Sequence, residues 1–91
     1  MRLTDLIPGA ASDDRITGFA IDHRKVAPGT IFGAFRGSRF NGEDYVAQAV
    51  QAGAIAIISA PGVTVEGAAH IVDEEPRRLF ARLAARFFAP F

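Results

Sequence analysis

The feature that most constrains the fold is a short apolar run, residues 54–59 (AIAIIS), placed directly after a helix-like segment. Within residues 43–52 apolar side chains recur at helical spacing, and Gly53 supplies the residue type that commonly ends a helix. A continuous apolar run behind a helix is typical of a strand buried on both faces. This pattern favours an α/β fold.

The other segments extend that prediction. A helical turn is predicted at 3–7, strands at 16–21, 30–35 and 69–72, a short edge segment at 63–65, and a final helix from an N-cap at Asp73 to Pro90. Asn41 is the expected N-cap of the middle helix, with Asp44 three residues later. The order of elements predicts a small α/β sandwich of two or three layers, with a mixed, mostly parallel sheet.

Composition excludes several classes of protein. The 91 residues are 49% hydrophobic, so the chain is one folded domain and not a disordered tail. Ten basic residues balance ten acidic ones, which leaves no global field to attract nucleic acid or an anionic membrane. No cysteine is present, so disulfides and thiolate metal sites are excluded. With no signal peptide and no membrane-length apolar run, we expect a cytoplasmic protein with neither a membrane nor a nucleic acid as partner.

Common catalytic motifs are missing from the sequence. It contains no GxxxxGK[ST] phosphate-binding loop, no GxGxxG fingerprint, and no HxxxH or HExxH metal motif. Asp22 beside His23 could orient an imidazole as a base, but such a pair in a loop is more often a turn device. His70, at the start of a predicted strand, is interpreted as structural. We therefore expect neither a metal site nor a catalytic residue.

Two polar loops, residues 22–29 and 36–42, stand out from this background. They bring Arg24, Arg36 and Arg39, with hydroxyl and amide groups and one aromatic ring, toward a helix N-terminus at one edge of the sheet. That combination suits an anionic ligand with a flat ring, such as a nucleotide. The alternative is a pair of solvated connections whose Gly and Asn residues satisfy turn geometry, and spacing alone favours this alternative.

The last predicted helix carries four arginines: Arg77, Arg78, Arg82 and Arg86. They lie opposite the apolar positions 79, 83 and 87, so we interpret them as a solvated helix face. The competing hypothesis is a phosphate- or RNA-binding face, and the absence of interleaved exposed aromatic residues weakens it.

Three strings of this sequence together resemble the N-terminal domain of the Mur ligases. They are residues 21–34 (IDHRKVAPGTIFGA), 37–42 (GSRFNG) and 49–54 (AVQAGA), and they occur in the family's order. The first and last segments are most similar to the member that adds the third stem-peptide residue of peptidoglycan to UDP-MurNAc-L-Ala-D-Glu. The central stretch is equally similar to the member that adds D-Ala-D-Ala.

The resemblance implies a role for the domain. Residues 1–91 would hold the UDP end of a UDP-MurNAc-peptide and would not catalyse alone. A central ATPase domain, which uses ATP and Mg²⁺, and a C-terminal domain would be absent from this chain, and no cofactor is expected here. A stand-alone interaction module is the alternative from another class.

The same resemblance assigns residues to the UDP site: Ile21, His23, Arg24, Ser38, Arg39 and Phe40. Two positions depart from the family pattern. His23 stands where Ser or Thr is usual, which replaces a small hydroxyl by a bulkier ring. Asn41 stands where Asp is usual, and both cap helices well.

Overall fold

The computed structural model of the chain describes residues 1–10, 12–37 and 41–89. The predicted site residues Ser38, Arg39 and Phe40, and the stop at Pro90, therefore lie outside the described residues. In chain order the elements are α1 (Leu3–Leu6), β1 (Gly18–Ala20), the 3₁₀-helix η1 (His23–Lys25), β2 (Thr30–Ala34), the 3₁₀-helix η2 (Gly42–Tyr45), α2 (Val46–Gln51), β3 (Ala56–Ser59), β4 (Ala69–Val72) and α3 (Pro76–Phe88).

The strands form one four-stranded sheet in the order β1-β2-β3-β4. All three strand pairs are parallel, and Ile57 of the predicted buried run pairs with Phe32 on one side and His70 on the other. The predicted α/β sandwich with a mostly parallel sheet is thus confirmed. The antiparallel part of the predicted mixed sheet is wrong, because every strand pair among the described residues is parallel and the antiparallel bridge between Arg2 and Arg15 lies outside the sheet.

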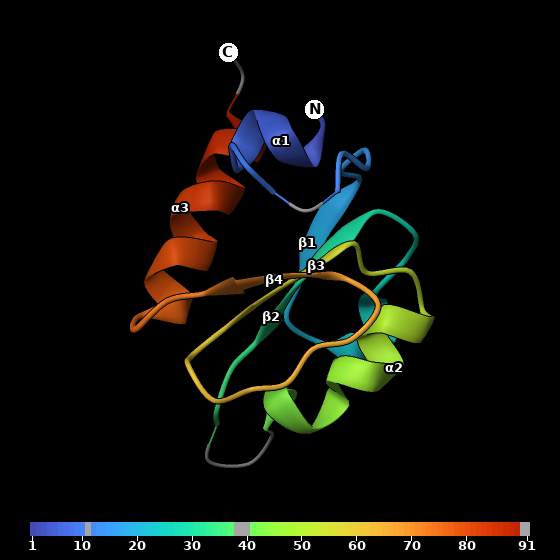
Figure 1. The fold of residues 1–91 in the computed structure, drawn as a ribbon, viewed down its shortest axis with the longest axis vertical. Coiled ribbons are helices and arrows are strands. Elements are labelled where there is room, and N and C mark those ends of the chain that lie inside the picture. The colour runs from blue at the N-terminus through green and yellow to red at the C-terminus, as the bar shows by residue number, and fades with distance from the viewer. Residues whose placement is uncertain (11, 38–40, 90–91) are drawn as a thin grey trace.

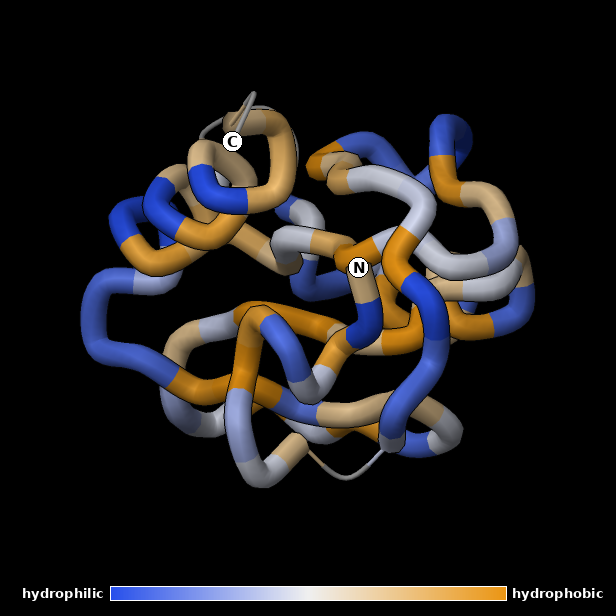
Figure 2. The backbone as a smooth tube through the Cα atoms, turned by 90° about the horizontal axis from the view of Figure 1, so that it is seen from above, coloured by the Kyte–Doolittle hydropathy of each residue, from blue (hydrophilic) through white to orange (hydrophobic). Residues whose placement is uncertain are grey.

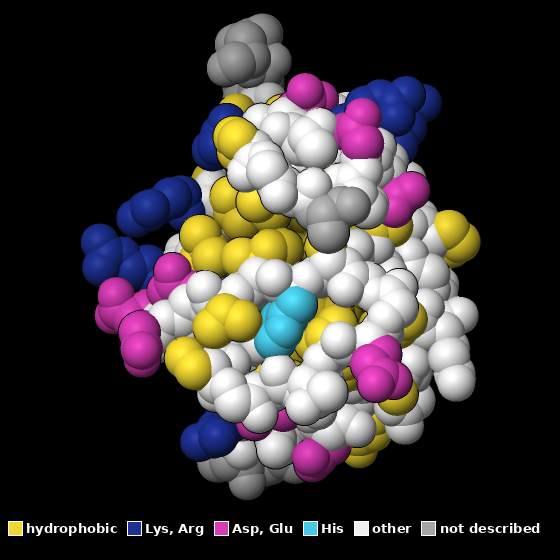
Figure 3. Space-filling view, viewed as in Figure 1, with side chains coloured by type: hydrophobic (Ala, Val, Ile, Leu, Met, Phe, Trp, Pro, Cys, Tyr) yellow, Lys and Arg dark blue, Asp and Glu magenta, His cyan; other side chains and the backbone are white. Residues whose placement is uncertain are grey.

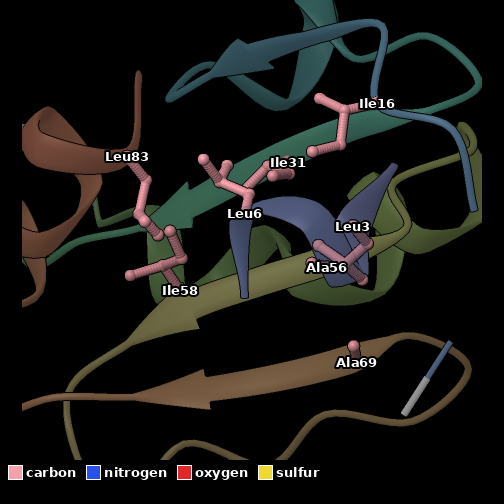
Figure 4. Packing of buried hydrophobic residues seen from close by; sticks show 8 residues of the cluster. All are labelled: Leu3, Leu6, Ile16, Ile31, Ala56, Ile58, Ala69 and Leu83. Atoms are coloured by element: carbon pink, nitrogen blue, oxygen red, sulfur yellow. The ribbon is translucent and has the colours of Figure 1, made fainter. Parts of the chain in front are cut away.

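Helices cover both faces of the sheet, which makes three layers (Figure 1). Alternate residues of β2 and β3 enter two separate cores, since successive side chains of a strand point to opposite faces. One core joins Ile31 and Ile58 to Leu6 of α1 and Leu83 of α3 (Figure 4). The other core joins the opposite face to α2. It contains Phe32, Ala34, Val46, Ala49, Ala54 and Ile57.

Burial explains why residues 54–59 read as a continuous apolar run. Every residue of β2 and β3 is buried, whereas β4, at an edge, alternates. Figure 2 shows the hydrophobic segments gathered toward the middle of the fold and the hydrophilic ones in the outer connections. Among the described residues, no helix has the length and apolar character needed to cross a membrane.

Three local predictions are wrong in detail. The predicted middle helix begins as 3₁₀ turns over Gly42–Tyr45 and becomes α-helical only at Val46. Residues 63–65 form no strand, and their valines instead pack against the core beneath α2. The N-cap of α3 is Glu75 and not Asp73. The Asp73 carboxylate instead accepts a hydrogen bond from the Glu75 backbone N–H at 2.8 Å, which shapes the turn before the helix.

Candidate functional site

The connections at the carboxyl ends of the strands all lie along one edge of the sheet, because the strands are parallel. η1 follows β1, residues 35–41 link β2 to η2, and α3 begins four residues after β4. In open α/β sheets this edge is where ligands commonly bind. We describe the edge from the turn after β1 to the start of α3.

The turn after β1 is built around Asp22, the N-cap of η1. Its carboxylate accepts hydrogen bonds from the Arg24 backbone N–H at 3.0 Å and from the Arg24 guanidinium at 3.0 and 2.9 Å. These hydrogen bonds lower the pKa of Asp22 from its ordinary 3.8 to about 2. The bond from the Arg24 side chain has the largest effect, and the bond from its backbone N–H comes second. The same partner raises the pKa of Arg24. The pair therefore braces the turn after β1.

The ring of His23 connects this turn to the next loop. It stacks on Tyr45 with ring centroids 4.1 Å apart and an interplanar angle of 2°. Both residues are half-buried. The stack joins the turn after β1 to η2, the 3₁₀-helix that follows the second loop, since Tyr45 ends η2. It also shows how the fold accommodates the imidazole at position 23.

The second loop closes back onto the end of β2. The Gly42 N–H donates to the Phe35 carbonyl at 2.7 Å, and Asn41 caps η2 by accepting from the Glu43 N–H at 3.4 Å. A Cβ at Gly42 would lie 3.0 Å from the Phe35 nitrogen, so glycine allows the close approach of the two backbones. The predicted N-cap at Asn41 is confirmed.

The start of α3 completes the edge. The Arg36 Nε donates to Glu43 at 3.0 Å, and the Arg77 guanidinium donates to the Arg36 carbonyl at 2.8 Å while lying 4.9 Å from the Phe35 ring centroid. These four residues line a pocket of about 440 Å³. The rest of its lining comes from Ala34, Ala60, Pro61, Glu75, Pro76 and Arg78.

The predicted site residues that the structure describes all lie in the turn after β1. Ile21 is 53% exposed, His23 is half-buried in its stack, and Arg24 is exposed and paired. The expected cationic edge is largely neutralised among the described residues, because Arg24 and Arg36 each face a carboxylate. Ile21 thus offers an exposed apolar surface and Arg24 offers hydrogen-bond donors. The positive charge of Arg24 is balanced by the Asp22 carboxylate.

Sequence reasoning missed two participants in this edge. Tyr45 falls within residues 43–52, where the sequence predicts a helix, yet its ring stacks on His23 from the end of η2. Arg77 was grouped with a solvated face, yet its side chain reaches residues 41 positions earlier in the sequence. No pattern of spacing in the sequence signals either contact, since both depend on how separate elements pack.

The remaining arginines of α3 are exposed, as predicted for a solvated helix face. Arg78 pairs with Glu75 at 3.3 Å, and Arg86 donates to the Leu6 carbonyl at 3.4 Å. Figure 3 shows basic side chains along the side of the molecule where α3 lies, with acidic side chains beside them. In the part of the chain that the structure describes, no three His, Cys, Asp or Glu residues come together as a metal site would require.

Comparison of the chain with known proteins identifies a family that it matches. Residues 15–88 match the family described as "Mur ligase family, catalytic domain". A UDP-N-acetylmuramoyl-L-alanyl-D-glutamate–2,6-diaminopimelate ligase of Zymomonas mobilis is 56% identical over 87% of this chain and 16% of its own length. The enzyme of the same name from Rhizobium meliloti is 34% identical over 97% of this chain and 21% of its own length.

A relative with a different activity also matches. The UDP-N-acetylmuramoyl-tripeptide–D-alanyl-D-alanine ligase of Mycobacterium leprae is 41% identical over 82% of this chain and 14% of its own length. The chain therefore spans about a fifth or less of the length of these three relatives.

The fold and its polar edge define an α/β domain of the three-layer class, with polar loops after the parallel strands. The chain belongs to the Mur ligase family, whose members are ligases of peptidoglycan synthesis.

Proposed function

We propose that this chain is the UDP-binding part of a ligase that adds 2,6-diaminopimelate, the third stem-peptide residue, to UDP-MurNAc-L-Ala-D-Glu. The observation that carries the proposal is the stack of His23 on Tyr45, which joins the turn after β1 to the 3₁₀-helix that follows the second loop. The names of the most similar relatives support the substrate. The resemblance of the loops to those of the family supports the location.

Each side chain at the edge has a role in this proposal. Ile21 offers an exposed apolar surface for the flat face of the uracil, and the stacked ring of His23 borders it. Arg24 is fixed by Asp22 and presents the outer part of its guanidinium to the diphosphate. Ser38, Arg39 and Phe40 are proposed to complete the contacts with uridine and phosphates.

The chemistry of ligation is assigned to the rest of the enzyme. The sequence has no GxxxxGK[ST] motif, so its residues do not fit a P-loop site for ATP and Mg²⁺, and we derive no step of phosphoryl transfer from them. ATP and Mg²⁺ are proposed for the full-length ligase. There, the peptide carboxylate would be phosphorylated and then attacked by the amine of the incoming amino acid.

An NMR titration of the 91-residue chain with UDP-MurNAc-L-Ala-D-Glu tests the proposal. We expect amide shift changes at residues 21–24 and 37–42, and UDP alone should reproduce most of them. MurNAc-L-Ala-D-Glu without the nucleotide is the control and should leave both segments unchanged. Changes that miss both segments would show that the site is misplaced.

A second candidate is the ligase that adds D-Ala-D-Ala, and the Mycobacterium leprae relative is the observation that favours it. Both ligases act on UDP-linked substrates by name, so the edge described above would serve either. The two are separated by assaying the full-length enzyme with diaminopimelate and with D-Ala-D-Ala as the incoming substrate.

Other classes receive less support from the structure. Nucleic-acid binding through α3 would need several unopposed arginines, yet Arg78 pairs with a carboxylate and two others bind backbone carbonyls. Retention on a polyanion column that falls steeply with salt would favour it. A stand-alone interaction module predicts no response to UDP in the titration above.

A further inference from the structure

Arg77 connects two segments that are far apart in the sequence. Its guanidinium donates to the Arg36 carbonyl at 2.8 Å and lies 4.9 Å from the centroid of the Phe35 ring. Phe35 is 8% exposed and packs edge-on against Phe80 of α3, the helix that carries Arg77, with ring centroids 5.3 Å apart. The first turn of α3 is thereby attached to the residues where the chain leaves β2.

Those residues form the base of the loop from 36 to 41. The base is closed by the hydrogen bond from the Gly42 N–H to the Phe35 carbonyl and by the ion pair of Arg36 with Glu43. The hydrogen bond from Arg77 is a third contact that holds this base, and it comes from α3, in a separate layer of the fold.

The contacts of Arg77 differ from those of the other arginines lining the pocket. Arg36 and Arg78 each face a carboxylate, whereas Arg77 faces a carbonyl oxygen and a ring. A hydrogen bond to a carbonyl and contact with an aromatic face together restrict where a planar guanidinium can lie. This geometry suits a side chain that holds the backbone in place.

We propose that Arg77 is a positioning residue for the base of the loop after β2, formed by Phe35, Arg36 and Gly42. By fixing the Arg36 carbonyl and the Phe35 ring, it holds this base in place, and so it raises the affinity of the edge for the nucleotide. This inference rests on the proposed function for its effect on affinity. Its effect on the loop itself is independent of any ligand.

The test compares Arg77→Ala and Arg77→Gln with Arg82→Ala. Arg82 lies on the same helix and is exposed, and within the described residues it makes no hydrogen bond or ion pair, which makes it the matched control. Glutamine can still donate to a carbonyl but carries no charge, so it separates positioning from direct attraction of the phosphates. UDP is the probe.

Two readouts are needed. In the ligand-free chain, amide hydrogen exchange at Gly42, whose N–H donates to the Phe35 carbonyl, should be faster in Arg77→Ala than in wild type, and unchanged in Arg82→Ala. The Kd for UDP should rise by roughly three- to thirtyfold in Arg77→Ala, the range found for residues that act at a distance. Arg77→Gln should retain most of the wild-type affinity, and it carries the comparison if the alanine variant does not fold.

The outcomes are distinguishable. Wild-type exchange and affinity in Arg77→Ala would overturn the inference. Unchanged exchange together with an equal loss of affinity in the alanine and glutamine variants would also overturn it, in favour of direct phosphate contact. Failure of the wild-type chain to bind UDP would refute the proposed function, while the exchange data would still decide whether Arg77 positions the loop.

Discussion

Replacement of Gly53 by alanine tests how the loop before β2 is held. Gly53 has φ +113°, and its carbonyl accepts a hydrogen bond from the Gly29 N–H at 3.0 Å. A Cβ at this position would lie 2.6 Å from the Pro28 Cα and 2.8 Å from its nitrogen. Because both are backbone atoms, the clash can be relieved only by moving the turn that precedes β2.

Gly62 provides the matched control. Its φ is +95°, and a Cβ there meets nothing within 4 Å among the described residues. Gly62→Ala therefore incurs only the backbone strain of positive φ, about 1–3 kcal/mol. The lower entropy of the unfolded alanine chain offsets about 0.4–1 kcal/mol of that cost. We expect the free energy of unfolding to fall by about 0.5–2 kcal/mol.

Gly53→Ala adds steric overlap of about 1–3 kcal/mol to the same strain, for a total loss of about 2–5 kcal/mol. Urea unfolding followed by circular dichroism at 222 nm measures both variants against wild type. Equal losses in Gly53→Ala and Gly62→Ala would refute the reasoning, because they would show that the contact with Pro28 yields without cost.

Three further predictions concern single residues. The Asp22 carboxyl, followed by NMR from pH 7 downward, should titrate near pH 2 and not near 3.8. Because its pKa is lower in the folded chain than in the unfolded chain, the carboxylate stabilises the fold fully above about pH 4. This stabilisation is lost as the pH falls through about 2. Ile58→Ala should lower the free energy of urea unfolding by about 2–5 kcal/mol, since Ile58 is fully buried, and Ile21→Ala by less than about 0.5 kcal/mol, since Ile21 is 53% exposed. Tyr45→Ala should cost about 0.5–1.5 kcal/mol in the same assay through loss of the ring stack, and Tyr45→Phe, which keeps the ring, should cost less.

The sheet could be predicted from the sequence because burial leaves a direct mark on composition. Residues 54–58 are all apolar because β3 is covered on both faces, and Gly53 ends the preceding helix with a positive φ. The edge strand β4 was also found, since His70 and Val72 alternate with Ala69 and Ile71. The strands could therefore be predicted where burial alone determines which residue types occur.

Contacts between elements were not predictable in the same way. The preference of Gly42–Tyr45 for 3₁₀ turns depends on the close approach of Gly42 to the end of β2, which no local pattern encodes. The path of Arg77 across to Arg36 likewise depends on the position of α3 against the sheet. The Asp22–Arg24 brace, by contrast, lies within three residues and is a local contact.

The central claim is that the turn after β1, together with the loop after β2, holds the uridine diphosphate group. Intermolecular nuclear Overhauser effects between bound UDP and the chain measure this most directly. We predict effects from the uracil H5 and H6 protons to Ile21 and His23. Effects confined to α3 or to the α2 face, with none to these residues, would contradict the claim.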